Sequence, residues 1–277
     1  MIGEKVSVII PTYNRSKYLK RAIQSVLEQS HNDIEIIVID DASTDDTEKI
    51  VQSFNDSRII YMRNDERKGA NFCRNAGLKI ASGNYIAFLD DDDYYCDKDK
   101  LRKQIGLFRK NKKLGFVGSA YYDELIKKER QPNVIGKVDK KLLISFSDIE
   151  TSTIMIKREV IEKIGFLDEQ FSSEQNHDFF YRISKLYEFD YLPEVAVIKG
   201  LSSSQISTNI KNKIIGYILF HKKHFHDFKE EGFRFFTYAM LKFFFGLFMF
   251  LFIGIFLKKF LLIPKIYESM KKLKIRA

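Results

Sequence analysis

The sequence predicts an α/β protein with a mostly parallel, doubly wound sheet, helices on both faces, and a C-terminal hydrophobic helical extension. Apolar, β-branched runs alternate with segments of helical spacing through the first part of the chain, an order typical of parallel sheets joined by crossover helices. Near the end, an uninterrupted apolar run covers residues 243–257. With 277 residues and 45% hydrophobic content, the chain can bury one large core and carry an appendage.

Each element expected in the first half follows from its local pattern. The run VSVII ends at Pro11, which predicts a strand. In the segment after it, apolar residues recur at helical spacing, which predicts a helix. The run IEIIVI ends at two aspartates, after which Ser43 has the position of a helix N-cap. The expected strands are 6–10, 34–39, 58–62 and 85–89, and the expected helices are 16–29, the one that Ser43 begins, and 70–81.

Three polar loops follow strands of this predicted sheet: PTYNR at 11–15, DDASTD at 40–45 and DDDD at 90–93. Loops at the carboxyl ends of parallel strands gather at one edge, where doubly wound folds bind ligands. Beyond residue 95 the pattern is less regular. The expected elements there are helices at 100–110 and 158–164, strands at 115–122 and 152–156, a polar excursion at 124–141, and an aromatic-rich helix within 165–189.

Charge and cysteine usage exclude several classes of protein. The formal net charge is +9, and much of the positive charge lies at 98–113, at 127–141 and in the last twenty residues. This asymmetry favours a membrane surface over a nucleic-acid groove, so no nucleic-acid partner is expected. Cys73 and Cys96 have neither disulfide nor zinc spacing, and residues 1–5 have no apolar signal segment. We therefore expect a reducing, cytoplasmic location.

The C-terminal part, residues 206–277, is expected to be a basic and apolar membrane-associating extension. Lys242 and the lysines after residue 257 flank the apolar run. Three interpretations of this run stay open: a helix that inserts into or lies on the membrane, a homo-oligomer contact, or a core helix. The basic tail favours the cytoplasmic face of the cell membrane. The histidines of FHKKHFHDF fit a basic amphipathic helix on lipid headgroups better than a metal site.

The stretch AFLDDDDYY places four carboxylates directly after a predicted strand. They are either a solvated loop or a site in which Asp90 and Asp92 hold a hard divalent cation, Mn²⁺ or Mg²⁺. The second acidic strand end, at Asp40 and Asp41, favours a charged ligand and its metal, since two such clusters at one sheet edge repel each other.

Five stretches in order, VSVIIPTYNR, IIVIDDASTDDT, KGANFCRNAGL, ASGNYIAFLDDDDYY and FLDEQFSSEQNHDFFYRI, resemble the motifs of family 2 glycosyltransferases. These are inverting enzymes of the GT-A fold that use nucleotide-diphosphate sugars. The resemblance covers about residues 5–198. It implies a GT-A domain over 1–205, with a nucleotide-sugar-binding half at 1–95 and an acceptor-binding half at 96–205.

The resemblance also implies roles for individual residues. It places Asp41 against the ring N–H of uracil, Arg74 near the diphosphate, Asp90 near the ribose and Asp92 on the metal. Asp90 is implied as a second metal residue, and Asp91 and Asp93 as supports of the loop. The remaining nucleotide-sugar residues that it implies are Pro11, Thr12, Tyr13, Arg15 and Asp91.

The base is where the sequence departs from the family pattern. Aligned on Asp178, the family's catalytic aspartate falls at Asn176, and an amide cannot act as a general base. Asp178 or Glu174 can take the role after a small shift, His177 can do so with a pKa near neutrality, or the protein is catalytically weakened. Asp178 is the leading candidate, with capping of the following helix as its alternative role.

Together these features predict an inverting, metal-dependent transfer of a sugar from a UDP-sugar to an acceptor hydroxyl on a glycan, expected to be polyprenyl-linked. Two alternatives stay open. One is a non-catalytic sugar-nucleotide-binding or scaffold protein that lost its base at Asn176, and the other is a nucleotidyltransferase, although PTYNR lacks the glycine-rich phosphate loop of that class. No motif identifies the sugar or the linkage.

Overall fold

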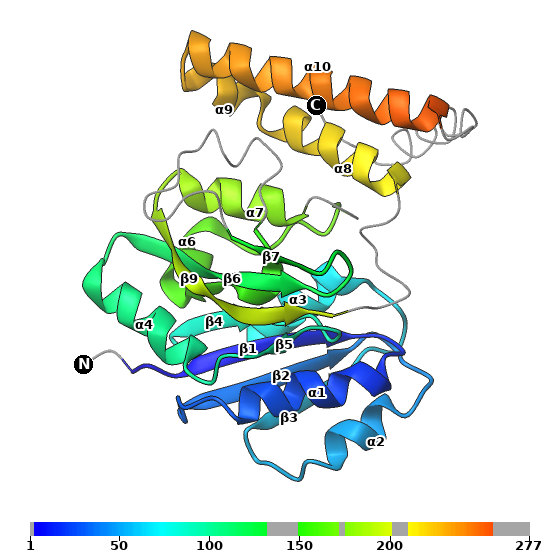
Figure 1. Cartoon of the computed structure of the whole chain (residues 1–277), viewed down its shortest axis with the longest axis vertical. Helices are drawn as coiled ribbons and strands as arrows, with labels where there is room; N and C mark the ends of the chain where they lie inside the picture. Colours follow the sequence, from blue (N-terminus) through cyan, green and yellow to red (C-terminus); the bar gives the residue numbers. More distant parts are fainter. Residues whose placement is uncertain (1–2, 132–148, 172–174, 201–209, 257–277) are drawn as a thin grey trace. The chain divides into compact units, whose positions relative to one another are not determined.

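A computed structural model describes residues 3–131, 149–171, 175–200 and 210–256 (Figure 1). Its contacts divide the chain into two units. The first comprises Met1–Val138, Asp148–Leu167 and Arg182–Ser203, and the second comprises Asp139–Ser147, Asp168–Tyr181 and Ser204–Ala277. The second unit thus takes in residues 168–181 besides the C-terminal part, and the division at 205/206 stays a prediction.

The first half of the sheet is parallel, as predicted. Its strands lie in the order β3-β2-β1-β4, and α1, α2 and α3 connect them. In β1 and β2 all residues are buried and most are apolar, as expected for strands that are covered on both faces. The elements are β1 (Val6–Thr12), α1 (Ser16–Leu27), β2 (Ile34–Asp40), α2 (Thr47–Gln52), β3 (Ile59–Arg63), α3 (Ala70–Ile80) and β4 (Tyr85–Phe88).

The second half of the sheet is mixed. After β4 the order continues β8-β6-β9-β5, with β8 antiparallel to both β4 and β6, β9 parallel to β6, and β7 on the edge of β6. The predicted strand 152–156 is divided into a short 3-10 turn and a strand. The elements are β5 (Tyr94–Tyr95), α4 (Lys100–Lys110), β6 (Leu114–Asp123), β7 (Lys128–Arg130), η1 (Thr151–Thr153), β8 (Met155–Lys157), α6 (Arg158–Ile164) and β9 (Glu188–Lys199).

Close packing of helices on the sheet fixes the strand ends. Leu19, Ile23 and Val26 of α1 are buried in the main hydrophobic core with the side chains of β1 and β2. On α3, a Cβ atom added to Gly77 would lie 2.5 Å from Cγ2 of Ile9, so only glycine allows this helix to approach β1 so closely. Such packing is costly to disturb because core side chains have no free volume to move into.

The second unit contains a small aromatic core. Its helices are α8 (Ile210–Lys223), α9 (Phe225–Glu230) and α10 (Phe233–Phe256), together with α7 (Gln175–Ser184) up to Tyr181. Tyr181, Phe220 and Phe228 meet edge-on or tilted in this core, with ring centroids 5.6 to 6.2 Å apart. Among the residues that the structure describes, no helix is both long enough and apolar enough to cross a membrane.

His221 and His224 lie within this aromatic core, each 3% exposed, whereas His226 is exposed. The two buried rings do not face solvent, because aromatic neighbours on α8 and α9 enclose them, and the contact of this stretch with lipid headgroups stays a prediction. Within the described residues, no metal-ligating cluster forms around these histidines.

Candidate active site

The three polar loops converge at the carboxyl edge of the parallel strands, as predicted. The backbone N–H of Asn14 donates to Ser43 Oγ at 2.9 Å, and Thr44 N–H donates to Asn14 Oδ1 at 2.7 Å. From the third loop, Asp91 Oδ2 accepts from Thr12 Oγ1 at 2.7 Å. Asn14 and Ala42 have positive φ values of 51° and 64°, a region that costs energy for residues other than glycine and is commonly found at functional sites.

Arg15 joins the first loop to the third loop, residues 90–93, which we call the acidic loop. Its Nη1 lies 2.8 Å from Asp91 Oδ1 and 3.1 Å from Asp92 Oδ2. Burial raises the pKa of the Asp91 carboxyl to about 6, although Arg15 and Thr12 act in the opposite direction. Burial lowers the pKa of Arg15, but Asp91 and Asp92 outweigh this effect and raise it. Arg15 and Thr12 thus contact the acidic loop, and whether they also contact a nucleotide stays a prediction.

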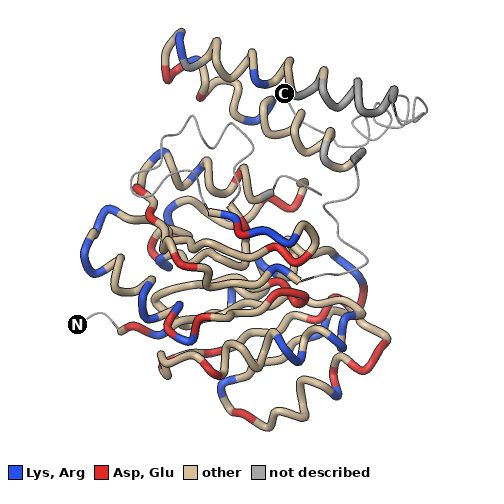
Figure 2. The backbone as a smooth tube through the Cα atoms, viewed as in Figure 1, with Lys and Arg blue, Asp and Glu red and all other residues tan. Residues whose placement is uncertain are grey.

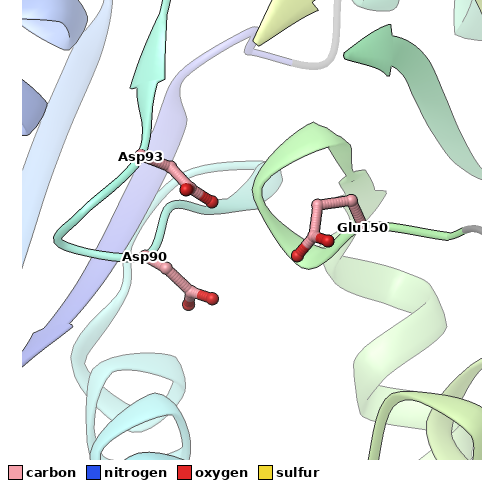
Figure 3. Close-up of side chains that lie close together, drawn as sticks. All are labelled: Asp90, Asp93 and Glu150. Atoms are coloured by element: carbon pink, nitrogen blue, oxygen red, sulfur yellow. The ribbon is translucent and has the colours of Figure 1, made fainter. Parts of the chain in front are cut away.

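Three carboxylates form a cluster that could hold a metal ion (Figure 3). Asp90, Asp93 and Glu150 each offer an oxygen atom, and these atoms lie within 4.8 Å of one another. Asp93 is buried and accepts hydrogen bonds from Ser152 Oγ and from the Gly200 N–H. Burial and the nearby charges of Asp90 and Glu150 raise the pKa of Asp93 well above its usual range.

Glu150 forms an ion pair with a lysine at the end of β9. Lys199 Nζ pairs with Glu150 Oε2, and burial nevertheless raises the pKa of Glu150. Lys199 at the end of β9 thus contacts Glu150, and the adjacent Gly200 contacts Asp93 of the acidic loop. At Gly200 a Cβ atom would lie 1.9 Å from the Asp92 carbonyl oxygen, so the loop depends on glycine there.

The residues of this cluster fit a hard divalent cation such as Mn²⁺ or Mg²⁺, because all the donors are carboxylate oxygens. Asp90 belongs both to the predicted metal pair and to the observed cluster. Asp92 is not in the cluster, and its carboxylate lies beside Arg15 instead. Sequence reasoning assigned Asp93 only a supporting role and did not find Glu150, which lies far along the chain with no motif around it.

Asp41 organises the segment that leads into α3. Its carboxylate accepts hydrogen bonds from the backbone N–H groups of Lys68 and Gly69, both at 2.8 Å, and from Asn64 Nδ2 at 2.9 Å. Burial alone would raise the pKa of Asp41, but these hydrogen bonds outweigh it and lower the pKa. Beside this segment, the guanidinium of Arg67 stacks over the Tyr13 ring, 4.2 Å from its centroid.

Arg74 is a buried cation with spare hydrogen-bonding capacity. Only 4% of the residue is exposed, and Nη2 pairs with Asp90 Oδ1. Its Nε and Nη1 atoms are buried and have no hydrogen-bond partner among the residues that the structure describes. Unsatisfied donors of a buried charged group are costly, so this guanidinium is suited to an anion at the strand ends.

The proposed base region lies in the second unit. Asp178 is fully buried, and its Oδ1 lies 2.9 Å from both Lys223 Nζ and His224 Nε2. The other ring nitrogen of His224 lies 2.8 Å from Asp227 Oδ2. Asn176 is half-buried on α7, and Glu174 lies outside the described residues. The assignment of Asp178 as base stays a prediction.

The fold is similar to that of solved glycosyltransferases. The structure of S. aureus TarS 1–349 in complex with UDP-GlcNAc matches with a TM-score of 0.62 and 20% identity, over 80% of this chain and 73% of that one. The mannosyltransferase PcManGT from Pyrobaculum calidifontis, in complex with GDP-Man and Mn²⁺, matches with a TM-score of 0.64 and 18% identity, over 81% and 67%. The predicted GT-A fold is thereby confirmed.

Curated relatives show higher identity. The chain is 39% identical over 169 residues to the UDP-Glc:alpha-D-GlcNAc-diphosphoundecaprenol beta-1,3-glucosyltransferase WfaP of Escherichia coli, over 59% of this chain and 64% of that protein's length. It is 31% identical over 246 residues to an uncharacterized glycosyltransferase of Methanocaldococcus jannaschii, over 81% and 84%. The model of the family described as Glycosyl transferase family 2 matches residues 7–166. This match covers more than half of the sequence and confirms the resemblance of its motifs: the chain belongs to glycosyl transferase family 2.

Proposed function

We propose that the protein transfers a sugar from a UDP-sugar to a hydroxyl group of a lipid-linked glycan, with inversion at the sugar carbon and with the help of a divalent metal. The observation that carries this proposal is Arg74. A buried guanidinium with two unpaired nitrogens beside a carboxylate cluster matches a ligand that combines a diphosphate with a metal ion.

The nucleotide would lie over the loops of β1, β2 and β4. Asp41 accepts hydrogen bonds from Asn64, Lys68 and Gly69 and from the Cys73 thiol. Because a thiol is a weak donor, the ring N–H of uracil would take its place at this carboxylate. Tyr13 and Arg67 form a stacked pair that offers a flat surface to the base. Arg74 then faces the diphosphate, and its fixed donors orient the leaving group.

A bound Mn²⁺ or Mg²⁺ would neutralise charge on the departing diphosphate. Asp90 would hold it, together with Asp92 as the sequence motif implies or with Asp93 and Glu150 as their positions favour. These alternatives differ in a measurable way. Glu150→Gln weakens Mn²⁺ binding only in the second, and Asp92→Asn does so most strongly in the first.

Inversion in one displacement requires a base that takes the proton of the acceptor hydroxyl. We propose a carboxylate in this role, with Asp178 as the leading candidate. Because its Oδ1 contacts Lys223 and His224, a contact must open before this oxygen can accept a proton. A non-catalytic nucleotide-binding protein is the second candidate function, favoured by Asn176 and by the burial of Asp178.

The proposed acceptor follows from the relatives. WfaP is named for an acceptor built on diphosphoundecaprenol, and a second relative, WfgD of Escherichia coli, 35% identical over 167 residues, is named for the same one. A lipid-linked acceptor places the enzyme at a membrane, and we propose the cytoplasmic face, where UDP-sugars are available. The matches cover 64% and 63% of the lengths of these two proteins. The sugar and the linkage are therefore left to experiment.

The decisive experiment offers a panel of UDP-sugars and a polyprenyl-diphosphate acceptor to the full chain and follows UDP release and the glycolipid product. We expect product with at least one UDP-sugar, and its loss in Arg74→Met. Asp178→Asn and Asn176→Asp test the base in the same assay. If the parent binds UDP but gives no product, and Asn176→Asp creates activity, the non-catalytic function is correct.

A further inference from the structure

Helix α10 carries a row of large apolar side chains that face water. Leu241, Phe244, Phe245 and Phe248 are 66%, 64%, 63% and 61% exposed. Their spacing of three, four and seven residues places them on one side of the helix. We call these four residues the apolar stripe. Exposed apolar patches on soluble surfaces are typical of interaction sites.

The opposite side of α10 is held by the helices of its own unit. Ala239 is fully buried there, and the ring of Phe243 stacks on Tyr217 of α8 with centroids 5.9 Å apart. The Tyr217 hydroxyl donates to the Lys242 carbonyl oxygen at 2.6 Å. Because these contacts fix the rotation of α10, the apolar stripe points away from the core of the unit, and packing within the unit leaves it exposed.

The charges around the apolar stripe identify its partner. The sequence of α10 contains two charged residues, Arg234 and Lys242, both positive, and the rest of its coloured part is tan in Figure 2. The sequence that follows, 258–276, contains seven lysines and arginines and one glutamate. A second copy of the chain would bring the same positive charge to the contact, whereas an anionic lipid surface offers the opposite charge together with an apolar interior.

We propose that the apolar stripe inserts into the boundary between headgroups and acyl chains of an anionic bilayer, with α10 lying along the membrane surface. Aromatic and aliphatic side chains on one face of a helix, next to basic residues, are the usual means of such binding. The link to a lipid-linked acceptor rests on the proposed function. The docking itself rests on the exposure, contacts and charge of α10 and on the basic sequence that follows it.

The test is vesicle flotation of the full chain with phosphatidylcholine vesicles that contain or lack phosphatidylglycerol. We compare the parent with Phe244→Ser/Phe245→Ser/Phe248→Ser. The matched control, Leu125→Ser/Ile126→Ser, removes two exposed apolar side chains from the first unit. We expect the triple variant to lower partitioning into anionic vesicles by about 100-fold or more and the control to change it less than about twofold. Circular dichroism and UDP titration establish that each variant is folded.

Unchanged vesicle binding by the triple variant would overturn the proposal. So would a parent that ignores vesicles and sediments as a dimer that the triple variant dissociates, because the apolar stripe would then be a contact between copies. If the parent binds vesicles through the stripe but does not bind UDP, the docking proposal stands and the proposed function falls.

Discussion

Lys100 is a buried lysine whose ionisation should dominate one part of the pH dependence of stability. It is fully buried on α4, its Nζ donates to Gln104 Oε1 at 3.0 Å, and it lies 4.2 Å from the centroid of the Tyr95 ring. Burial lowers the pKa of Lys100 from 10.5 to about 7, although Asp97 acts in the opposite direction. The amine is therefore neutral in the folded chain over much of the range in which the unfolded chain carries its charge.

The sign and size of the effect follow from linkage. Between pH 7 and 10.5 the unfolded state binds more protons than the folded state, so stability rises with pH in this window. One pKa unit corresponds to about 1.4 kcal/mol, and the penalty of charge is therefore about 5 kcal/mol at pH 6 and about 2 kcal/mol at pH 9. Lys100→Met removes this penalty. It also removes the hydrogen bond to Gln104, which costs about 1 to 3 kcal/mol at either pH.

The assay is urea unfolding at pH 6 and pH 9, followed by far-ultraviolet circular dichroism, for the parent and for Lys100→Met. We expect the advantage of the variant to be about 2.5 kcal/mol smaller at pH 9 than at pH 6. Lys110→Met serves as the control because Lys110 is exposed on the same helix, and its effect should be the same at both pH values. An equal effect of Lys100→Met at both values would refute the reasoning.

Three further predictions concern the sheet and its loops. The pKa of Glu35 is about 2, because hydrogen bonds from Lys5, Ser7 and Ser82 outweigh burial. Glu35→Gln should therefore lose about 3 kcal/mol of stability at pH 7. In urea unfolding, the difference in stability between parent and variant should disappear as the pH falls from 4.5 to 2. Asp41→Asn leaves a buried N–H group without an acceptor, so it should lower stability by about 1 to 3 kcal/mol in the same assay. It should also weaken UDP binding, measured by calorimetry, and an unchanged UDP affinity would contradict the proposed uracil contact. Gly200→Ala should weaken UDP and Mn²⁺ binding at least about tenfold, because a Cβ atom there meets the Asp92 carbonyl oxygen, whereas Gly106→Ala, with open space around it, should bind normally.

Much of the fold could be predicted because strands and helices leave periodic patterns. The bounds of α4 and α6 match the predicted ranges 100–110 and 158–164. Prediction failed where a tertiary contact decides the structure. Ser43 looks like an N-cap, but its N–H donates to Asp40 Oδ1 and its Oγ accepts from Asn14, so α2 begins only at Thr47.

The site was predictable only in part, for a similar reason. The strand-end loops of the parallel half follow their strands directly, so sequence alone brought Asp41 and Asp90 to one edge. Glu150 and Lys199 reach that edge through the mixed half of the sheet, and their positions depend on the antiparallel course of β8 and on the register of β9. No local pattern encodes such pairings, which is why sequence reasoning missed both residues.

The charge of the acidic loop links its structure to its chemistry. The four carboxylates of Asp90 to Asp93 and that of Glu150 gather there, and three cationic side chains contact them in the described part of the chain: Arg15, Arg74 and Lys199. With all groups ionised, two negative charges remain, which is the charge that one divalent cation cancels. The raised pKa values of Asp91 and Asp93 have the same cause, because buried carboxylates without enough positive charge favour the protonated form. A loop built for stability alone would contain fewer acids or more cations, so its composition is best explained by a ligand that brings positive charge with it.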